Sequence, residues 1–198
     1  YDGSVQPSVS LLDGPSSLPL QNVELWLDAD ESTTVTHSSN AVSQWKDKSG
    51  KDNHASQSTA ANQPTLTASG LNGKPVITFD GTSDHITSTG LNITQSYSIF
   101  LVAKTNNNST GRDYLFDGVG STQSHRSLIA LDNGGKIQMW ASAWANSNFN
   151  TPSGYFALSA VFNTSNSSLS LNGTRATGLS VGSYNLTNGI RIGCNHVD

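Results

Sequence analysis

Two aspartates follow an alternating apolar run in the segment "VITFDGTSDHI", which covers residues 76–86. Asp80 stands beside Gly81, and Asp84 comes four residues after Asp80. Three roles are open to such a pair: the carboxylates can bond backbone amides in a turn, supply oxygen ligands to calcium, or act as the acid and base of a glycosidase. An Asp-Gly step directly after a strand favours the turn first, calcium second and acid–base chemistry third.

A second candidate segment, "MWASAWANSNFN" (residues 139–150), interleaves aromatic rings with amides. Aromatic rings stack on the apolar faces of sugars, and amides hydrogen-bond to their hydroxyl groups. On one strand, residues four apart share a face and lie roughly 13 Å from each other. The alternative is that both tryptophans belong to the core. The candidate ligand-binding residues are Trp140, Trp144, Asn146 and Asn148.

Patterns that indicate catalysis are weak. Retaining glycosidases place two carboxylates about 5 Å apart, a spacing that acids two or four residues apart on a strand would provide. The two glutamates, Glu24 and Glu31, lie in no such array, and the closest match is "DAD" at 28–30. The arginines are scattered singly, and the five histidines lack the spacing of zinc ligands. We therefore predict no catalytic residue.

The composition argues against two classes of partner. Only 12% of the 198 residues are charged, and the net charge of -4 provides no basic surface for nucleic acid. No apolar run approaches the roughly 18 residues that a membrane span requires. A surface rich in Ser, Thr, Asn and Gly is typical of extracellular β proteins, so we expect a secreted or cell-surface location.

The elements that must position these residues are predicted to be strands. Residues 1–20 lack periodicity and read as a linker or loosely docked segment, with one domain over 21–198. We expect a strand at 23–30 and mostly turns and loops over 31–75. Alternating segments then follow at short intervals: "KPVITFD", "YSIFLVAKT", "DYLFDG", "SLIALD", "KIQMWASAW", "YFALSAVF", "SLSLNG" and "GIRIGC". This spacing, with Asn-Gly connectors, predicts an all-β antiparallel two-sheet sandwich or jelly roll.

Several segments resemble one family in order and spacing. "LWLDAD", "QWKDKSGKDNHASQ" and "QPTLTASGLNGKPVITFDGTSDHI" are similar to the N-terminal half of laminin-G-like (concanavalin A-like lectin/glucanase) jelly-roll domains. "RDYLFDG", "SLIALDNGGKIQMW" and "YFALSAVFNTSNSSLSLNGTRAT" look like the central hairpins of that family. The resemblance covers roughly residues 21–194 and implies the all-β jelly-roll sandwich.

The same resemblance implies a further strand after "RIG", of the type "GxIAEVxxYxR". The sequence ends instead at "CNHVD". We expect that the closing strand is missing from this chain and that a neighbouring strand is left with an unpaired edge. Two explanations stay open: truncation or processing of the chain, and completion of the sheet by a partner segment.

Together these observations predict a non-catalytic extracellular binding or adhesion module that recognises a glycan or a protein, as part of a larger surface or secreted protein. Calcium at Asp80 and Asp84 is its predicted cofactor. One alternative is a structural subunit of a surface assembly completed by strand addition. The other is a glycanase or polysaccharide lyase domain, which would require paired acids or an Arg-Tyr-His cluster in a groove.

Overall fold

The structure is a computed structural model that describes residues 22–105, 112–119 and 126–194. The predicted linker at 1–20 lies outside the described residues, so the proposed domain boundary stays a prediction. No helix in the described part of the chain is long and apolar enough to cross a bilayer.

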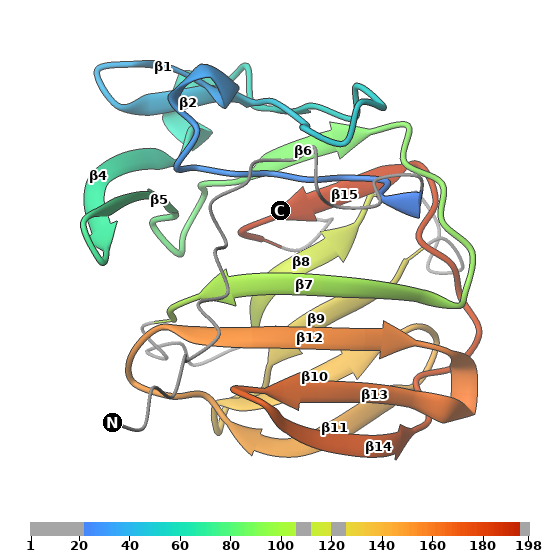
Figure 1. Cartoon of the computed structure of the whole chain (residues 1–198). Coiled ribbons are helices and arrows are strands. Elements are labelled where there is room, and N and C mark those ends of the chain that lie inside the picture. Colours follow the sequence, from blue (N-terminus) through green and yellow to red (C-terminus); the bar gives the residue numbers. More distant parts are fainter. Residues whose placement is uncertain (1–21, 106–111, 120–125, 195–198) are drawn as a thin grey trace, which may run out of the picture.

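Two antiparallel β-sheets lie face to face, one of eleven strands and one of four (Figure 1). The larger sheet has the order β11-β10-β9-β8-β15-β6-β3-β2-β4-β5, and β1 pairs with β2 beside this path. Its strands are β1 (Val35–Ser38), β2 (Ala41–Trp45), β3 (Ala55–Ser56), β4 (Thr65–Leu71), β5 (Lys74–Thr78), β6 (Ile86–Thr89), β8 (Asp113–Gly118), β9 (Leu128–Leu131), β10 (Lys136–Trp140), β11 (Trp144–Asn150) and β15 (Gly189–Ile192).

The smaller sheet has the order β14-β13-β12-β7. Its strands are β7 (Tyr97–Ala103), β12 (Phe156–Phe162), β13 (Ser167–Leu171) and β14 (Thr174–Leu179). The helical elements named within the described ranges are single 3-10 turns, η3 (Ser32–Thr34), η4 (Ala60–Asn62) and η6 (Thr164–Asn166). The predicted all-β class with two antiparallel sheets is confirmed.

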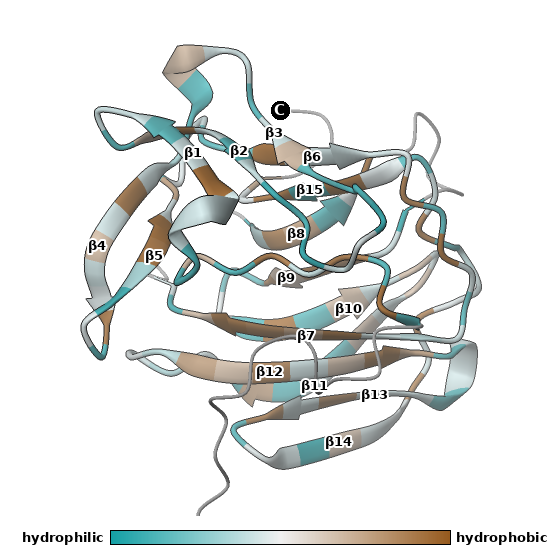
Figure 2. Ribbon diagram, turned by 45° about the horizontal axis from the view of Figure 1, so that its top comes forward, coloured by the Kyte–Doolittle hydropathy of each residue, from teal (hydrophilic) through white to brown (hydrophobic). Residues whose placement is uncertain are grey.

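The main core fills the space between the two sheets. Side chains alternate between the faces of a strand, and β12 accordingly buries every second residue from Phe156 to Phe162. Apolar and polar residues alternate along several strands of both sheets (Figure 2). Both sheets contribute to this core, including Phe116, Ile129, Leu131, Ile137, Met139, Phe156, Leu158, Ala160, Phe162 and Leu169.

A second, smaller core lies under the other end of the larger sheet. It is formed by Val35, Val42, Ala55 and Ile86. Trp45 packs against this cluster from β2, and its cross-strand neighbour on β3 is Ala55. The larger sheet therefore packs against two apolar clusters. The side chains on its other face, which points away from these clusters, are available for other roles.

The strands predicted after residue 74 are present, with one correction. The run "KIQMWASAW" is a hairpin, in which β10 ends at Trp140 and β11 begins at Trp144. The strand predicted over 23–30 is wrong, because its described pairing is an isolated bridge between Leu27 and Asp47. The loop prediction for 31–75 is wrong in part, since β1 to β4 lie within this range.

The predicted unpaired edge has a candidate in β7. β15 is an interior strand, between β8 and β6, whereas β7 ends the smaller sheet and pairs with β12 alone among the described strands. β7 also carries two exposed apolar side chains, Phe100 at 80% exposure and Val102 at 64%. The missing closing strand itself stays a prediction.

Candidate binding site

Cross-strand register aligns one row of side chains on the face of the larger sheet that points away from the smaller sheet. We call this the outer face; it lies on the far side of the molecule in the view of Figure 1. The row consists of Thr36, Gln44, Ser56, Thr87, Arg191, Asp117, Leu128, Trp140 and Trp144. It changes from hydroxyl and amide groups at one end, through a charged centre, to aromatic rings at the other.

The two tryptophans at the end of this row are neighbours in a hairpin. They are opposite residues of β10 and β11, and their ring centroids lie 6.3 Å apart. The predicted separation of roughly 13 Å along one strand is therefore wrong, because the chain reverses between the two residues. The prediction that they share a face holds, since directly opposite residues of an antiparallel pair point the same way.

A distant segment fixes this reversal. The N–H groups of Ala141 and Ala143 both donate to the carbonyl oxygen of Val181, at 2.8 and 2.9 Å. The next residue, Gly182, has a φ of +89°, and a Cβ on it would lie 2.4 Å from the carbonyl oxygen of Ala141. Only glycine fits there, so the hairpin is clamped by a contact that local sequence does not encode.

The clamp lies in the segment "GLSVG" at 178–182, which has Gly-x-Ser-x-Gly spacing; the prediction that the sequence offers no nucleophile elbow of this type overlooked it. A Gly-x-Ser-x-Gly motif presents a catalytic serine only where it links a strand to a helix in a sharp turn. Here the motif leaves β14, which ends at Leu179, and the described residues after it form loop and then β15. Val181 is fully buried and holds the hairpin. The structure gives this motif a packing role.

Trp140 is buried, at 9% exposure, in a small cluster on the outer face. Leu128 and Ala130 are its buried neighbours, and the ring of Tyr184 meets the indole edge-on with centroids 5.7 Å apart. Trp140 is therefore buried, which is the exposure that the alternative of a core role expected. Its cluster is separate from the core between the sheets.

A buried ion pair borders this cluster. Arg126 binds the carboxylate of Asp117 through two hydrogen bonds, from Nε to Oδ1 at 3.0 Å and from Nη2 to Oδ2. The guanidinium carbon also lies 5.7 Å from the ring centre of Trp140. Asp117 is fully buried, and a buried carboxylate needs such a partner because desolvation of a lone charge is costly. Its charge is thus neutralised within the fold.

Trp144 differs from Trp140 because 41% of it is exposed. The guanidinium carbon of Arg112 lies 3.9 Å from its ring centre, in a cation–π contact. Nε and Nη2 of Arg112 also donate to the side-chain oxygen of Gln138, at 3.4 and 3.3 Å. We call Arg112, Gln138, Trp140, Trp144 and Asn146 the tryptophan–arginine site.

The two predicted asparagines lie beside Trp144 on β11. Asn146 is the cross-strand partner of Gln138, so two amides stand together next to the ring. The side-chain oxygen of Asn146 accepts the N–H of Asn148 at 2.8 Å, and Asn146 is exposed on β11. Asn148 is exposed and has a φ of 62°, where the register of β10 and β11 shifts.

Asp80 and Asp84 form the predicted turn. Oδ1 of Asp80 accepts the N–H groups of Thr82, Ser83 and Asp84 at 2.8, 2.9 and 2.9 Å. In return, Oδ2 of Asp84 accepts the N–H of Asp80 at 3.0 Å. Gly81 has a φ of +74°, a conformation that glycine adopts without strain. Each of the two carboxylates therefore accepts a hydrogen bond from the backbone N–H of the other aspartate.

These bonds separate the acidities of the two carboxyl groups. The N–H of Asp84, followed by that of Thr82, stabilises the ionised form of Asp80 and lowers its pKa. Burial raises the pKa of Asp84, and the negative charge of Asp80 adds to the rise. No group of three or more His, Cys, Asp or Glu side chains placed to hold a metal occurs among the described residues. The calcium prediction for Asp80 and Asp84 stays a prediction.

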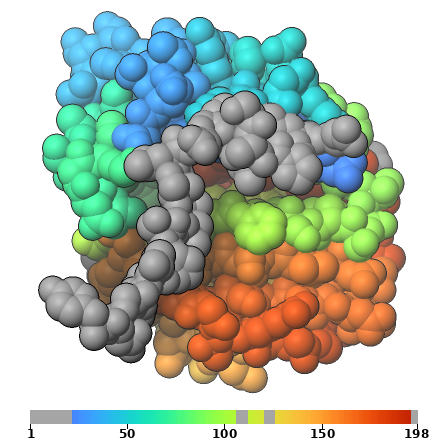
Figure 3. Space-filling model, viewed as in Figure 1, coloured from blue at the N-terminus to red at the C-terminus, as the bar shows by residue number. Residues whose placement is uncertain are grey.

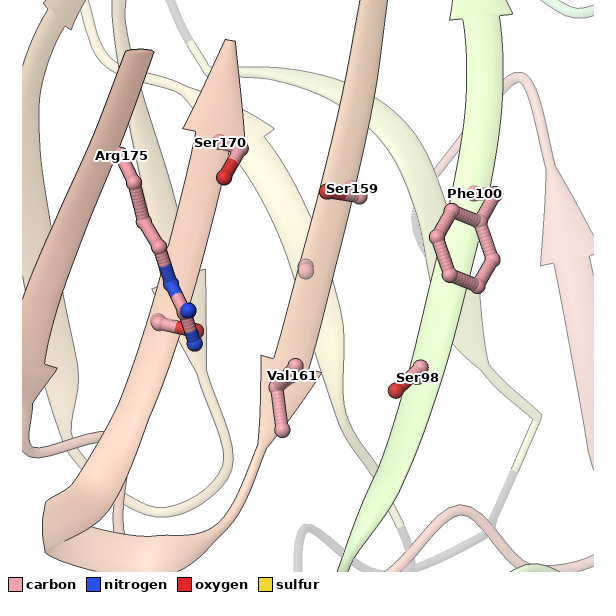
Figure 4. A pocket seen from close by; sticks show the side chains of 8 residues that line it. Ser98, Phe100, Ser159, Val161, Ser170 and Arg175 are labelled. Carbon is pink, nitrogen blue, oxygen red and sulfur yellow. The ribbon is translucent and has the colours of Figure 1, made fainter. Parts of the chain in front are cut away.

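The outer side of the smaller sheet carries a shallow hollow of about 210 Å³ (Figure 4). Strands β7, β12, β13 and β14 present this side to the viewer in Figure 3. Phe100, Val161 and Arg175 line the hollow together with several serines, and Nη2 of Arg175 donates to Ser168 at 2.9 Å. This surface offers one exposed aromatic ring among hydroxyl groups, and lacks the paired rings and amides of the outer face of the larger sheet.

Two members of the tryptophan–arginine site were missed by the sequence analysis. Gln138 was within reach, because it precedes Trp140 by two residues in the alternating run "KIQMW" and so shares its face. Arg112 was not, because β9 and β10 separate its strand from Trp144 on β11. Its position depends on the order of four strands, which no single segment reveals.

Comparison with solved structures finds a similar fold in the Trypanosoma rangeli sialidase. The two superpose with a TM-score of 0.54 at 12% sequence identity, over 80% of this chain and 26% of the sialidase chain. This chain therefore spans about a quarter of the sialidase, and at this identity the likeness shows the fold alone. A scan of protein-family models and a search of curated proteins gave no match. The chain is an all-β sandwich of two antiparallel sheets.

Proposed function

We propose that this chain is a non-catalytic carbohydrate-binding module, built on a laminin-G-like jelly roll and acting outside the cell as part of a larger surface or secreted protein. One observation carries the proposal: Trp144 is 41% exposed on a fixed hairpin, beside the amides of Gln138 and Asn146. A sugar ring needs an apolar platform and adjacent hydrogen-bonding groups, and sites of this kind place a few polar groups around an aromatic surface.

The rigidity of the platform supports binding. Trp140 packs against one side of Trp144, and the clamp of Val181 on Ala141 and Ala143 fixes the hairpin between the two rings. A preformed site loses little conformational entropy when a ligand binds, so more of the contact energy appears as affinity.

The non-catalytic part of the proposal is based on the distribution of acids. Glycosidases need two carboxyl groups about 5 to 9.5 Å apart on either side of the scissile bond. Asp117 is the one carboxylate that the register places in the row of the outer face, and Arg126 holds it in a buried ion pair. A buried, paired carboxylate is a poor nucleophile or proton donor to a bound sugar.

Glycan-array binding of three matched proteins tests the proposal. The unaltered protein is compared with Trp144→Ala and with Phe100→Ala, which removes the exposed aromatic ring of the opposite sheet. We expect Trp144→Ala to lose binding to the glycans that the unaltered protein retains, and Phe100→Ala to retain it. Thermal unfolding of each variant confirms that it is folded, and repetition with a chelator tests the calcium prediction.

A second candidate function follows from β7. This strand ends the smaller sheet with Phe100 and Val102 exposed, and an exposed apolar edge strand is a template for another strand. A structural subunit completed by strand addition fits this edge. Light scattering of the purified chain distinguishes the two, because edge pairing between copies gives dimers or filaments that Val102→Lys abolishes.

A further inference from the structure

We propose that the ligand of the tryptophan–arginine site is an acidic glycan, and that Arg112 binds its carboxylate or sulfate group. This inference rests on the proposed carbohydrate-binding function and specifies the class of sugar. Its basis is the state of the Arg112 side chain, which is held in position but not neutralised.

Arg112 is held by uncharged groups. It lies over the ring of Trp144 with its guanidinium carbon 3.9 Å from the ring centre, and two of its N–H groups reach one amide oxygen of Gln138 at 3.3 and 3.4 Å. These long hydrogen bonds orient the planar group at low cost. Among the described residues the remaining N–H groups have no acceptor, so they can bind an anion in the two-pronged geometry that guanidinium favours.

In the part of the chain that the structure describes, no carboxylate neutralises Arg112, because none lies within ion-pair distance of its side chain. Arg126, on the same face, is instead fully engaged by Asp117. Arg112 therefore presents a positive charge at the rim of the aromatic cluster, in a protein whose net charge is -4.

The local arrangement discriminates between acidic and neutral sugars. A neutral sugar that binds the exposed part of the Trp144 ring beside Arg112 removes water from the guanidinium without supplying a charged partner, and loss of solvation without compensation weakens binding. A sugar with a carboxylate or sulfate supplies that partner, while Gln138 and Asn146 remain beside the ring for its hydroxyl groups. Trp144 then provides affinity for the ring, and Arg112 provides preference for the acid.

Calorimetric titration with matched short oligosaccharides tests the inference. One pair is an oligogalacturonate and its methyl ester; the other is a sulfated galactan oligomer and its desulfated form. We expect at least about tenfold tighter binding of an acidic member than of its neutral partner, and weakening of this binding by salt. The pair that shows the difference identifies carboxylate or sulfate as the bound group.

Two arginine variants complete the test. Arg112→Gln should reduce the affinity for the acidic oligomer about tenfold, to that of the neutral one, while Arg112→Lys should restore part of it. Arg175→Gln, which removes an exposed arginine of the opposite sheet, should leave the affinity unchanged.

Three outcomes overturn parts of the argument separately. Equal binding of acidic and neutral oligomers that still requires Trp144, with no effect of Arg112→Gln, overturns the acidic-glycan inference and leaves the proposed function intact. Equal losses in the Arg112 and Arg175 variants show unspecific attraction of anions and also overturn it. Absence of Trp144-dependent binding to any oligomer or arrayed glycan overturns the proposed function and the inference together.

Discussion

Lys48 lies over the ring of Trp26, and Arg112 lies over the ring of Trp144, in two regions of the molecule that use the same contact differently. Lys48 is 14% exposed and donates to Oδ2 of Asp28 at 2.8 Å, so its charge is paired inside the fold. Arg112 is exposed and is held by the neutral amide of Gln138. The partner of the cation decides whether the pair stabilises the fold or remains available to a ligand.

The surroundings of the tryptophans agree with this division. The backbone of Trp26 is tied at both ends, because its N–H donates to Asp47 and its carbonyl oxygen accepts the N–H of Lys48, both at 2.8 Å. Trp144 has no such anchor beyond its strand ladder and the rings around it. The first pair connects the segment before β1 to the turn after β2, and the second stands at the end of the sheet.

The largest expected effect is the loss of Asp47, which holds the Trp26 region together. Its carboxylate accepts the N–H groups of Trp26, Ser49 and Asn53 and the hydroxyl of Ser49, at 2.6 to 3.0 Å. Asp47→Ala leaves these donors without a partner and should lower the free energy of unfolding by about 3 kcal/mol in urea denaturation. Asp52→Asn, whose side chain is 91% exposed and whose φ of +58° asparagine also tolerates, is the control and should change it by less than about 0.5 kcal/mol.

The next effect compares the two rings directly. Trp26→Ala should lower the free energy of unfolding by about 2 kcal/mol, because it removes a half-buried ring with a fixed backbone. Trp144→Ala should lower it by less than about 1 kcal/mol, since much of that ring is already in water, and should abolish glycan binding. Similar losses of stability in the two variants would show that Trp144 also belongs to the structural framework.

The two tryptophan regions also show what the sequence could predict. In strands such as β12, buried and more exposed residues alternate within the segment itself, here "FALSAVF", and this alternation located the strand in the sequence. The strand predicted at Trp26 failed because the apolar alternation there is real, but its backbone is bound by the side chain of Asp47 and the N–H of Lys48 instead of by a continuous neighbouring strand. Alternation identifies which residues face inward, and it does not identify what satisfies the backbone.

The prediction of one continuous strand through Trp144 was wrong for a different reason. The turn residues of "ASA" carry neither Gly nor Asn, the usual signals of a reversal, and the carbonyl oxygen that holds the turn belongs to Val181. The stacking of Arg112 on Trp144 likewise requires the order β8-β9-β10-β11. The candidate platform residues were found by type, whereas their geometry and their cation depend on long-range contacts.

A smaller effect separates the two cations. Lys48→Met removes the ion pair with Asp28 and the contact with Trp26. It should lower the free energy of unfolding by about 1 kcal/mol, a modest value because the ion pair is only partly buried. Arg112→Gln should change it by less than about 0.5 kcal/mol, because Arg112 is exposed and forms no ion pair with any residue that the structure describes. Chemical denaturation at low salt measures both. If Arg112→Gln is less stable than Lys48→Met, the proposed difference between a structural cation and a ligand-binding cation is wrong.

The smallest effect is the acid dependence of the Lys48 pair. Burial raises the pKa of Asp28, but the hydrogen bond from Lys48 leads the bonds and charges that outweigh it, so the pKa lies below its usual value. A carboxyl group whose pKa is lower in the folded state stabilises the protein above its unfolded pKa of about 3.9, and that contribution is lost as the pH falls through the folded value. The difference in unfolding free energy between the unaltered protein and Asp28→Asn should therefore be about 0.5 kcal/mol at pH 6 and should vanish in stronger acid, where Asp28 is itself neutral. Among the described residues no carboxylate pairs with Arg112, so binding of a sulfated oligomer should be equal at pH 6 and pH 4. A rise in that binding over the same interval would mean that a carboxylate of the protein competes with the ligand for Arg112, and the contrast between the two cations would then be lost.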